Sequence, residues 1–196
     1  MADFAVSIRK VLKHEGCAWD ENGNLIETGY CNNPDDPGGE TIYGITHDEA
    51  VENGWVGPIS EMPLSFATEI YRVKYWIPLW GEHIDDQGIA DEVFDTAVNC
   101  GLKTSVIFLQ RALNVLNERQ KLWPDVAVDG LMGGTTSLTL NTAIVSRPYM
   151  RLCILRAIDS LQCCRYIVLA ESNPKFETFM PGWLRARCGV EGIIEP

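Results

Sequence analysis

Apolar residues recur three and four positions apart along most of the chain, which is the spacing of one face of an α-helix. The clearest case is residues 4–14, where Ile8 and Leu12 follow Asp3, a residue type that caps helix N-termini. Gly16 is expected to end this helix. The same spacing predicts further helices at residues 64–75, 89–98, 104–116 (capped by Thr104), 138–144 and 149–169 (opened by Pro148).

Strand patterns are weak by comparison, since no segment alternates strictly enough between apolar and polar residues to require a large sheet. Residues 17–46 are rich in Gly, Pro, Asn and Asp, and Asn22-Gly23 is a typical hairpin turn. The segment after Asp20 does not fit a calcium loop, because Cys31 stands where the bidentate Glu belongs. We therefore expect a mainly α fold with at most a small β-hairpin in 17–46.

The composition is that of a globular protein, with 46% of the 196 residues apolar and 22% charged. This length suits one domain, or a small domain with an appendage. A net charge of −11 argues against nucleic acid as a partner. Apolar runs stay below the ~18 residues that cross a bilayer, and the first ten residues do not resemble a secretory signal. We expect a monomer made in the cytoplasm, without stable membrane insertion.

Charge is divided unevenly along the chain. Twelve acidic residues and no lysine or arginine lie between Lys13 and Arg72. Residues 146–190 instead carry seven basic residues and three acidic ones. The acidic block is either a solvated surface or a setting for carboxylate chemistry, and a motif is needed to decide.

Seven cysteines and three histidines do not form a recognisable metal site. No Cys-x-x-Cys is present, and the histidines are widely separated. Buried reduced thiols are the plain interpretation without a secretion signal, and a disulfide between Cys17 and Cys31 is the alternative in an oxidising compartment. We expect no metal and no organic cofactor.

The end of the first predicted helix carries the residue best suited to catalysis. Glu15 lies on the last turn of this amphipathic helix, beside the core and facing whatever the next loop encloses. Partial burial and nearby carboxylates raise the pKa of such a carboxyl group. A general acid that cleaves a glycosidic bond needs a proton retained near neutral pH. The plainer interpretation is a helix end followed by an acidic turn, and spacing alone does not decide between them.

A longer pattern points to a family. Residues 36–46 read Asp-Pro-Gly-Gly-Glu-Thr-Ile-Tyr-Gly-Ile-Thr. This resembles the signature of the glycoside hydrolase family 108 muramidases, a group of phage endolysins and bacterial wall hydrolases, in which Glu-Gly-Gly precedes Asp-Pro-Gly-Gly-x-Thr-x-x-Gly-Ile-Thr. Tyr75-Trp76 and residues 94–101 resemble later signatures of the same family.

The C-terminal part resembles the small peptidoglycan-binding domain that usually accompanies this family. The resemblance rests on residues 109–114 (Leu-Gln-Arg-Ala-Leu-Asn), on 128–130 (Val-Asp-Gly) and on 182–184 (Gly-Trp-Leu) with the arginines that follow. It implies a lysozyme-like muramidase domain over residues 1–101 and a helical peptidoglycan-binding domain over 102–196. Arginines of the second part would suit either peptidoglycan stem peptides or the acidic first part, and both explanations stay open: Arg147, Arg151, Arg156, Arg165, Arg185 and Arg187.

The family resemblance leaves two registers for the acid. Glu15 is followed by Gly16-Cys17 rather than by two glycines, and it lies 21 residues before Asp36, a longer spacer than the family has. Glu27 stands at the shorter distance and imitates the missing half of the signature. We prefer Glu15, because it follows the helical pattern directly and a catalytic acid needs a rigid element beneath it. In this register residues 17–29 form an inserted hairpin.

The remaining site residues follow from the resemblance. Asp36 and Thr41 are the candidates for the second catalytic role, with Asp35 as the alternative for Asp36. Asp36 precedes a proline, so it is equally suited to starting a turn. Aromatic residues that would stack on sugar rings, or pack in the core instead, are Tyr43, Tyr75 and Trp76.

Two further acids have plain structural interpretations. Asp129 lies in the turn that resembles peptidoglycan-binding modules, and it is a candidate for substrate binding or simply a helix cap. Asp95 is expected to be a buried structural acid that pairs with a loop.

The resemblance implies an N-acetylmuramidase that cleaves the β-1,4 bond between N-acetylmuramic acid and N-acetylglucosamine in bacterial peptidoglycan, with Glu15 as general acid. A lytic transglycosylase is the nearest alternative, and a non-catalytic peptidoglycan-binding or secretion-associated protein is another. Such an enzyme would reach the cell wall or periplasm by holin-type release during phage lysis, or by dedicated export.

Overall fold

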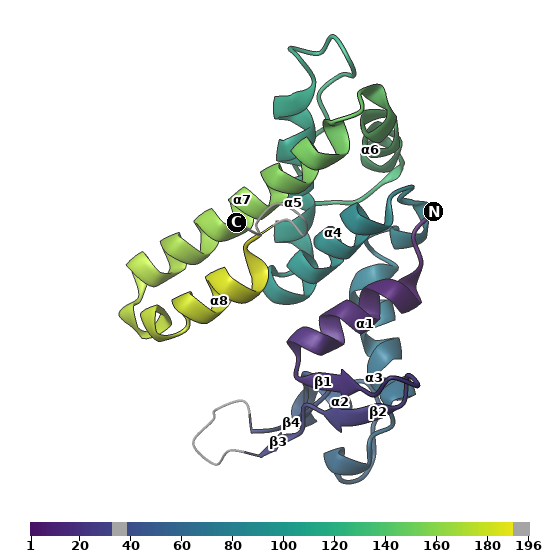
Figure 1. Ribbon diagram of the computed structural model, residues 1–196, viewed down its shortest axis with the longest axis vertical. Coiled ribbons are helices and arrows are strands. Elements are labelled where there is room, and N and C mark those ends of the chain that lie inside the picture. The colour runs from purple at the N-terminus through teal and green to yellow at the C-terminus, as the bar shows by residue number, and fades with distance from the viewer. Residues whose placement is uncertain (33–38, 190–196) are drawn as a thin grey trace.

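The computed structural model describes residues 1–32 and 39–189. Helices dominate it, and the predicted mainly α fold with a small β region is confirmed (Figure 1). The α-helices of this part are α1 (Phe4–His14), α2 (His47–Glu52), α3 (Leu64–Tyr71), α4 (Gln87–Cys100), α5 (Leu102–Leu116), α6 (Gly134–Ser146), α7 (Met150–Ser172) and α8 (Met180–Arg187). Short 3₁₀ or π turns are η1 (Ile59–Glu61), η2 (Arg72–Trp76), η3 (Gly81–His83) and η4 (Pro174–Thr178).

The first helix forms as its sequence predicts. The Asp3 side chain accepts a hydrogen bond from the Ala5 backbone N–H at 2.8 Å, which satisfies one free donor at the N-terminus of α1. The apolar face, with Val11 and Leu12, is buried. Gly16 follows the helix with φ +83°, a left-handed conformation that turns the chain toward the sheets.

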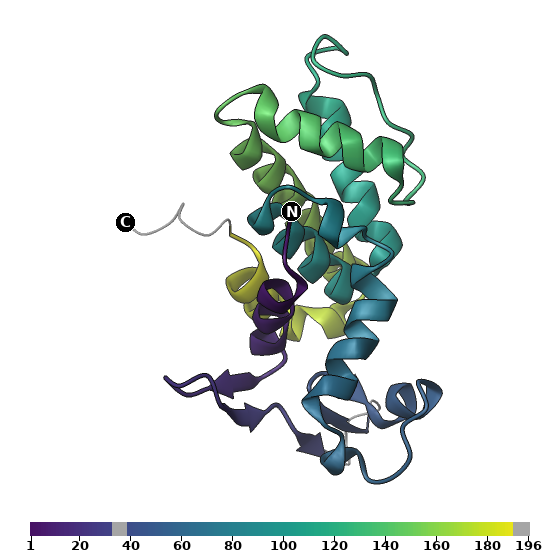
Figure 2. The same cartoon turned by 90° about the vertical axis from the view of Figure 1, so that its right-hand side faces the viewer.

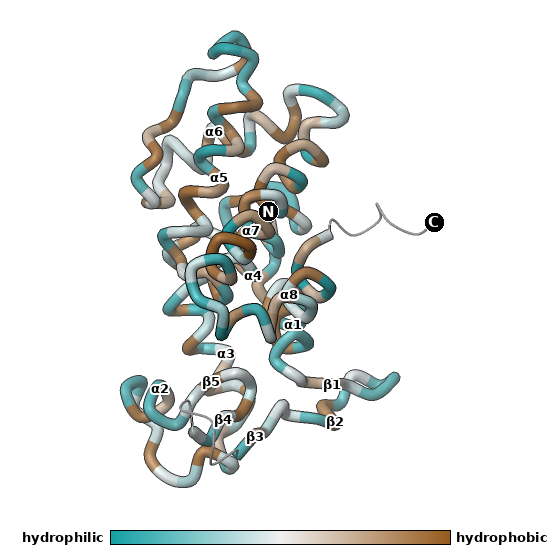
Figure 3. Tube along the Cα trace, turned by 90° about the vertical axis from the view of Figure 1, so that its left-hand side faces the viewer, coloured by the Kyte–Doolittle hydropathy of each residue, from teal (hydrophilic) through white to brown (hydrophobic). Residues whose placement is uncertain are grey.

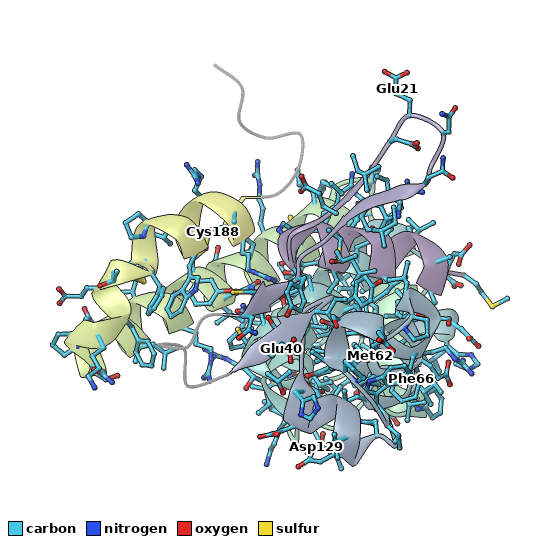
Figure 4. All side chains as sticks on the ribbon, turned by 90° about the horizontal axis from the view of Figure 1, so that it is seen from below. Glu21, Glu40, Met62, Phe66, Asp129 and Cys188 are labelled. Carbon is cyan, nitrogen blue, oxygen red and sulfur yellow. A yellow bond between two sulfur atoms is a disulfide. The ribbon has the colours of Figure 1, made fainter. Side chains whose placement is uncertain are left out.

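Two small antiparallel sheets lie at the foot of α1 (Figure 1). Their strands are β1 (Cys17–Trp19) with β2 (Leu25–Thr28), and β3 (Cys31–Asn32) with β4 (Glu40–Ile42) and β5 (Ile45–Thr46). The first pair is the predicted hairpin, and Gly23 has φ +85° in its turn. Glu21 lies at the tip of this hairpin and projects away from the molecule (Figure 4).

The alternative disulfide between Cys17 and Cys31 is wrong for this structure. Cys17 is opposite Thr28 in one sheet and Cys31 is opposite Thr41 in the other, and both thiols are free. Sequence proximity suggested the pair, but the two strands belong to different sheets.

The later helices agree with the predicted ones except at their ends. α5 begins at Leu102 instead of after a Thr104 cap, because Gly101, with φ +90° and ψ +144°, ends α4 and starts α5. Thr104 therefore lies inside the helix. α6 and α7 are both longer than predicted, and the short helices α2 and α8 were not predicted.

One hydrophobic core runs through both parts of the chain. α4 packs against α1, α5 and α7, and residues as distant in sequence as Ile8, Phe94, Leu113 and Ile158 belong to the same buried cluster. Apolar and polar residues alternate along the helices in Figure 3, as expected of amphipathic helices around a shared core. No helix in residues 1–32 and 39–189 is long and apolar enough to span a membrane.

The last helix folds back along α7 (Figure 1). A disulfide joins Cys163 of α7 to Cys188, directly after α8. The Trp183 ring lies against the rings of Tyr166, Phe176 and Phe179. These contacts hold α8 beside α1, as Figures 2 and 3 show.

Candidate active site

Glu15 is the residue that caps the C-terminal end of α1. From this helix end the chain passes directly into the first strands (Figure 2). Its backbone N–H still donates to the Val11 carbonyl at 3.1 Å, so the residue keeps its place on the last helical turn. Its side chain is 26% exposed. The carboxyl group is thus held by a rigid element and is partly shielded from water.

Gly44 leaves the space that the Glu15 carboxyl group occupies. A Cβ at this position would lie 2.7 Å from Glu15 Cγ, 2.7 Å from the Tyr71 hydroxyl and 2.8 Å from Glu15 Oε2. Gly44 also has φ +75°, in the left-handed region that favours glycine. The Tyr71 hydroxyl donates to the Tyr43 carbonyl at 3.0 Å, which fixes the same turn. Both the backbone and the clearance therefore require glycine here.

A cavity of about 250 Å³ opens beside this carboxyl group. Residues from the sheet, α2, α3, η2 and α4 line it, and together they make a largely polar wall. The lining residues are Glu15, Gly44, Ile45, Glu49, Tyr71, Tyr75, Val98 and Asn99. A partly buried acid that faces a polar cavity is the arrangement a general acid needs.

Arg187 of α8 reaches the Glu15 carboxyl group from the C-terminal part of the chain. One nitrogen, Nη2, lies 3.2 Å from Glu15 Oε1. The other, Nη1, donates to both oxygens of Asp95 at 2.7 and 2.8 Å. Asp95 is thus a partly buried acid that pairs with a helix rather than with the expected loop. In the sequence, Arg187 differs in no way from the other basic residues of 146–190, so its contact with Glu15 could not be predicted there.

Burial raises the pKa of Glu15 above its ordinary value. The positive charge of Arg187 opposes this rise, and the negative charge of Asp95 adds to it. The same burial, together with the Glu15 charge, raises the pKa of the Cys17 thiol to about 11. Glu15 therefore retains its proton to a higher pH than a free glutamate does.

Glu49 is a second carboxylate on this cavity, and it was missed in the sequence. It accepts a hydrogen bond from Lys74 Nζ at 2.6 Å, and its side chain is 23% exposed. Thr46 caps α2 by accepting from the Glu49 N–H at 3.2 Å, so Thr46-x-x-Glu49 has the spacing of a capping box. That spacing could have located the residue, although it predicts a side chain turned back to the cap.

The predicted aromatic residues have different fates. Tyr75 lines the cavity. Trp76 is 1% exposed and its ring packs against Phe4 and Phe94, so the expected sugar stacking by Trp76 is wrong for this structure. Tyr43 is 6% exposed, and it contributes a backbone carbonyl rather than an open ring face. Core packing explains both of the buried rings.

The predicted partners of Glu15 are only partly described. Asp35 and Asp36 lie outside the described residues. Thr41 is in β4, opposite Thr46, and is not among the described residues that line the cavity. The second catalytic role therefore rests on the family pattern for Asp36 and on the geometry for Glu49.

Two other predicted positions lie away from the cavity. Glu27 is exposed in β2, opposite Ala18, and does not line the cavity among the described residues. Asp129 accepts hydrogen bonds from the Gln110 side chain at 2.9 Å and from the Leu131 N–H at 2.9 Å. Asp129 thus stabilises its own turn, and its role in substrate binding stays a prediction.

Arg187 and Asp95 also line a larger cavity of about 400 Å³ between α1, α4, α7 and α8. Glu92 lines it too, and burial raises the pKa of this carboxyl group to about 8, with a further rise from the Asp95 charge. The Arg187 ion pairs therefore stand next to both cavities.

Metal-binding geometry is confined to one cluster in the described part of the chain. Asp159, Cys163 and Cys188 bring a carboxylate and two sulfur atoms close together. Both cysteines are engaged in the disulfide, so they offer no thiolate to an ion in this form.

Residues 8–101 match the family model for glycosyl hydrolase 108, and residues 104–188 match that for a predicted peptidoglycan domain. The N-terminal half is a glycosyl hydrolase 108 domain. The hydrolase therefore acts on peptidoglycan, and its C-terminal half is a peptidoglycan-binding domain. The general function and the family that the sequence motifs implied are confirmed.

A solved structure shares the fold of the hydrolase along nearly its whole length. SagA from Brucella abortus is 24% identical, with a TM-score of 0.60, and the match covers 94% of this chain and 91% of SagA. At this identity the likeness shows a common fold. Among curated proteins, none matches the sequence significantly.

Proposed function

We propose that the hydrolase is an N-acetylmuramidase that cleaves the β-1,4 bond between N-acetylmuramic acid and N-acetylglucosamine, with Glu15 as the general acid. One observation carries this proposal: a half-buried carboxyl group with a raised pKa faces a polar cavity from the end of a rigid helix. A glycosidic oxygen leaves as an alcohol only if it is protonated as the bond breaks. Glu15 supplies that proton, and its raised pKa keeps the group protonated to a higher pH than a free glutamate.

The second role in glycoside cleavage belongs to a carboxylate that activates water or attacks the sugar directly. Asp36 is the candidate from the family pattern, with Thr41 beside it in sequence. Glu49 is the candidate from geometry, because it lines the same cavity as Glu15 and pairs with Lys74. Asp36→Asn and Glu49→Gln separate these candidates. The variant that removes the second catalytic carboxylate should lower kcat far more than the other variant.

Product analysis tests the reaction itself. Purified peptidoglycan is digested with the full chain, and the new sugar ends are identified by mass. Reducing N-acetylmuramic acid ends are expected. Anhydro ends would assign the chain to the lytic transglycosylases. Reducing N-acetylglucosamine ends would show that the enzyme cleaves the bond from N-acetylglucosamine to N-acetylmuramic acid instead.

Substitution of the acid tests the residue assignment. Glu15→Gln should lower the rate of peptidoglycan clearing by about 10²–10⁴-fold, because it removes the donated proton. Glu27→Gln is the matched control, since Glu27 is exposed on a strand. A dead Glu27 variant with an active Glu15 variant would reverse the assignment.

We further infer a role as an endolysin that accumulates in the cytoplasm and reaches the wall by holin-type release or dedicated export. Expression inside a bacterial cell tests this. Lysis is expected only when a membrane-permeabilising holin is co-expressed, and lysis by the hydrolase alone would contradict the dependence on release.

A further inference from the structure

The Arg187 side chain is buried and held in a fixed position where it contacts Glu15. Its side chain is 9% exposed, although it belongs to a short helix near the end of the chain. Both Asp95 oxygens accept from Nη1, so the guanidinium has a fixed orientation before it meets Glu15. The contact with Glu15 uses the second terminal nitrogen, Nη2, at 3.2 Å.

The backbone around Arg187 is anchored as well. The next residue, Cys188 (labelled in Figure 4), forms the disulfide with Cys163 of α7. The Gly189 N–H donates to Asp159 Oδ1 at 3.0 Å, which ties the following residue to the same helix. Arg187 is therefore held by α7 through its neighbours and by α4 through its own side chain.

The two oxygens of Glu15 have different surroundings. Oε1 faces the guanidinium of Arg187, whereas Oε2 lies on the Gly44 side, toward the lining of the cavity. A guanidinium has only donors, so the oxygen that faces it must accept and does not carry a proton. The proton of the neutral acid is thereby directed to Oε2. After proton transfer, the same cation stabilises the carboxylate that remains.

We propose that Arg187 is a positioning residue for the catalytic acid, so that the peptidoglycan-binding half supplies part of the active site. This inference rests on the proposed role of Glu15 as general acid. Arg187 touches no reacting atom. It acts by selecting the oxygen that donates the proton and by stabilising the ionised product.

The charge environment of Glu15 gives the proposal a pH signature. Arg187 lowers the pKa of Glu15 and Asp95 raises it. Removing the cation should therefore move the alkaline limb of the rate profile to higher pH, and removing the Asp95 charge should move it to lower pH. Ionisable groups face or neighbour Glu15 from each surrounding element: His14, Cys17, Glu49, Tyr71, Tyr75, Asp95 and Arg187.

The experiment measures kcat/KM against pH for the full chain on a soluble glycan fragment. Arg187→Gln is expected to lower kcat/KM by about 10- to 100-fold, the range of a charge-assisted hydrogen bond, and to move the alkaline limb upward. Arg187→Lys should restore much of the limb position, because it keeps the charge. Lys175→Gln is the control, an exposed cation in η4, the turn before α8, and should behave as the parent.

Asp95→Asn provides a second test, because it should move the alkaline limb in the opposite direction from Arg187→Gln. If Arg187→Gln does not fold, Asp95→Asn still tests the proposal, since it should move the limb downward while thermal unfolding reports the fold. An Arg187 variant that matches the Lys175 control in rate and in the position of the alkaline limb overturns the proposal. A faster Arg187 variant also overturns it, because the arginine would then block the acid.

A double variant separates this proposal from the assignment of Glu15. In a Glu15→Gln background, Arg187→Gln should have no further effect, because the group through which it acts is gone. If Glu15→Gln stays active, the assignment of the acid fails. If Glu15→Gln is dead and Arg187→Gln equals the parent, only the positioning role fails.

Discussion

The substitution Gly44→Ala measures how tightly the catalytic acid is packed. The added methyl group would meet three atoms at 2.7–2.8 Å, two of them on Glu15 and one on Tyr71. These are side-chain atoms, so the acid itself must move to make room. The backbone at φ +75° adds strain of its own.

The two costs can be estimated separately. A Cβ in the left-handed region costs about 1–2 kcal/mol, and forcing extra volume into a packed site costs about 1–3 kcal/mol. The sum, about 2–5 kcal/mol, lowers Tm by roughly 4–20 °C in a chain of this length. Because the clash falls on Glu15, kcat/KM should drop by about 10²-fold or more even in the folded fraction.

Gly54→Ala is the matched control. Gly54 has φ +93°, but a Cβ there would meet no atom within 4 Å. It should lose only about 1–2 kcal/mol of stability and keep full activity. Thermal unfolding and initial rates of peptidoglycan clearing are measured for both variants. If Gly44→Ala clears the wall as fast as Gly54→Ala, Glu15 is not the acid or is not held by this contact.

Three other results are expected. Activity of the parent should fall as pH rises through the raised pKa of Glu15, since only the protonated acid works, and a limb at the pKa of a free glutamate would contradict burial. Reduction of the Cys163–Cys188 disulfide, or the substitution Cys163→Ser, should lower the free energy of unfolding by about 3 kcal/mol. A reductant should not lower the stability of the Cys163→Ser variant any further. Trp76→Ala should lose about 3–5 kcal/mol of stability, whereas Tyr75→Ala should raise KM and leave Tm nearly unchanged.

The sequence predicted the helices and turns that depend on interactions between residues close together in the chain. α1 has its cap, its apolar stripe and its terminating glycine within one short segment, and all three lie where the sequence predicts. The Asn22-Gly23 turn is correct for the same reason. At α5 the capping preference of Thr104 gave way to Gly101, which can adopt the conformation that joins two helices directly.

The active site was less predictable, because tertiary contacts assemble it. Glu15 was preferred over Glu27 because it follows an amphipathic helix directly, although its spacing from Asp36 departs from the family pattern. Arg187 lies 172 positions away and belongs to no local pattern with Glu15. Trp76 and Tyr75 are adjacent in sequence and equally aromatic, so only packing distinguishes the buried ring from the ring that lines the cavity.

A single residue joins α4 to α5, so the two halves of the hydrolase are held at a fixed separation. Two domains joined by a flexible linker can take many positions relative to each other. Here Gly101 alone separates the two helices, and one core continues across it. The position of the peptidoglycan-binding half relative to the Glu15 cavity is therefore fixed by helix packing. Glycan strands should be cut at a set interval from the point of attachment rather than at any bond within a tether's radius.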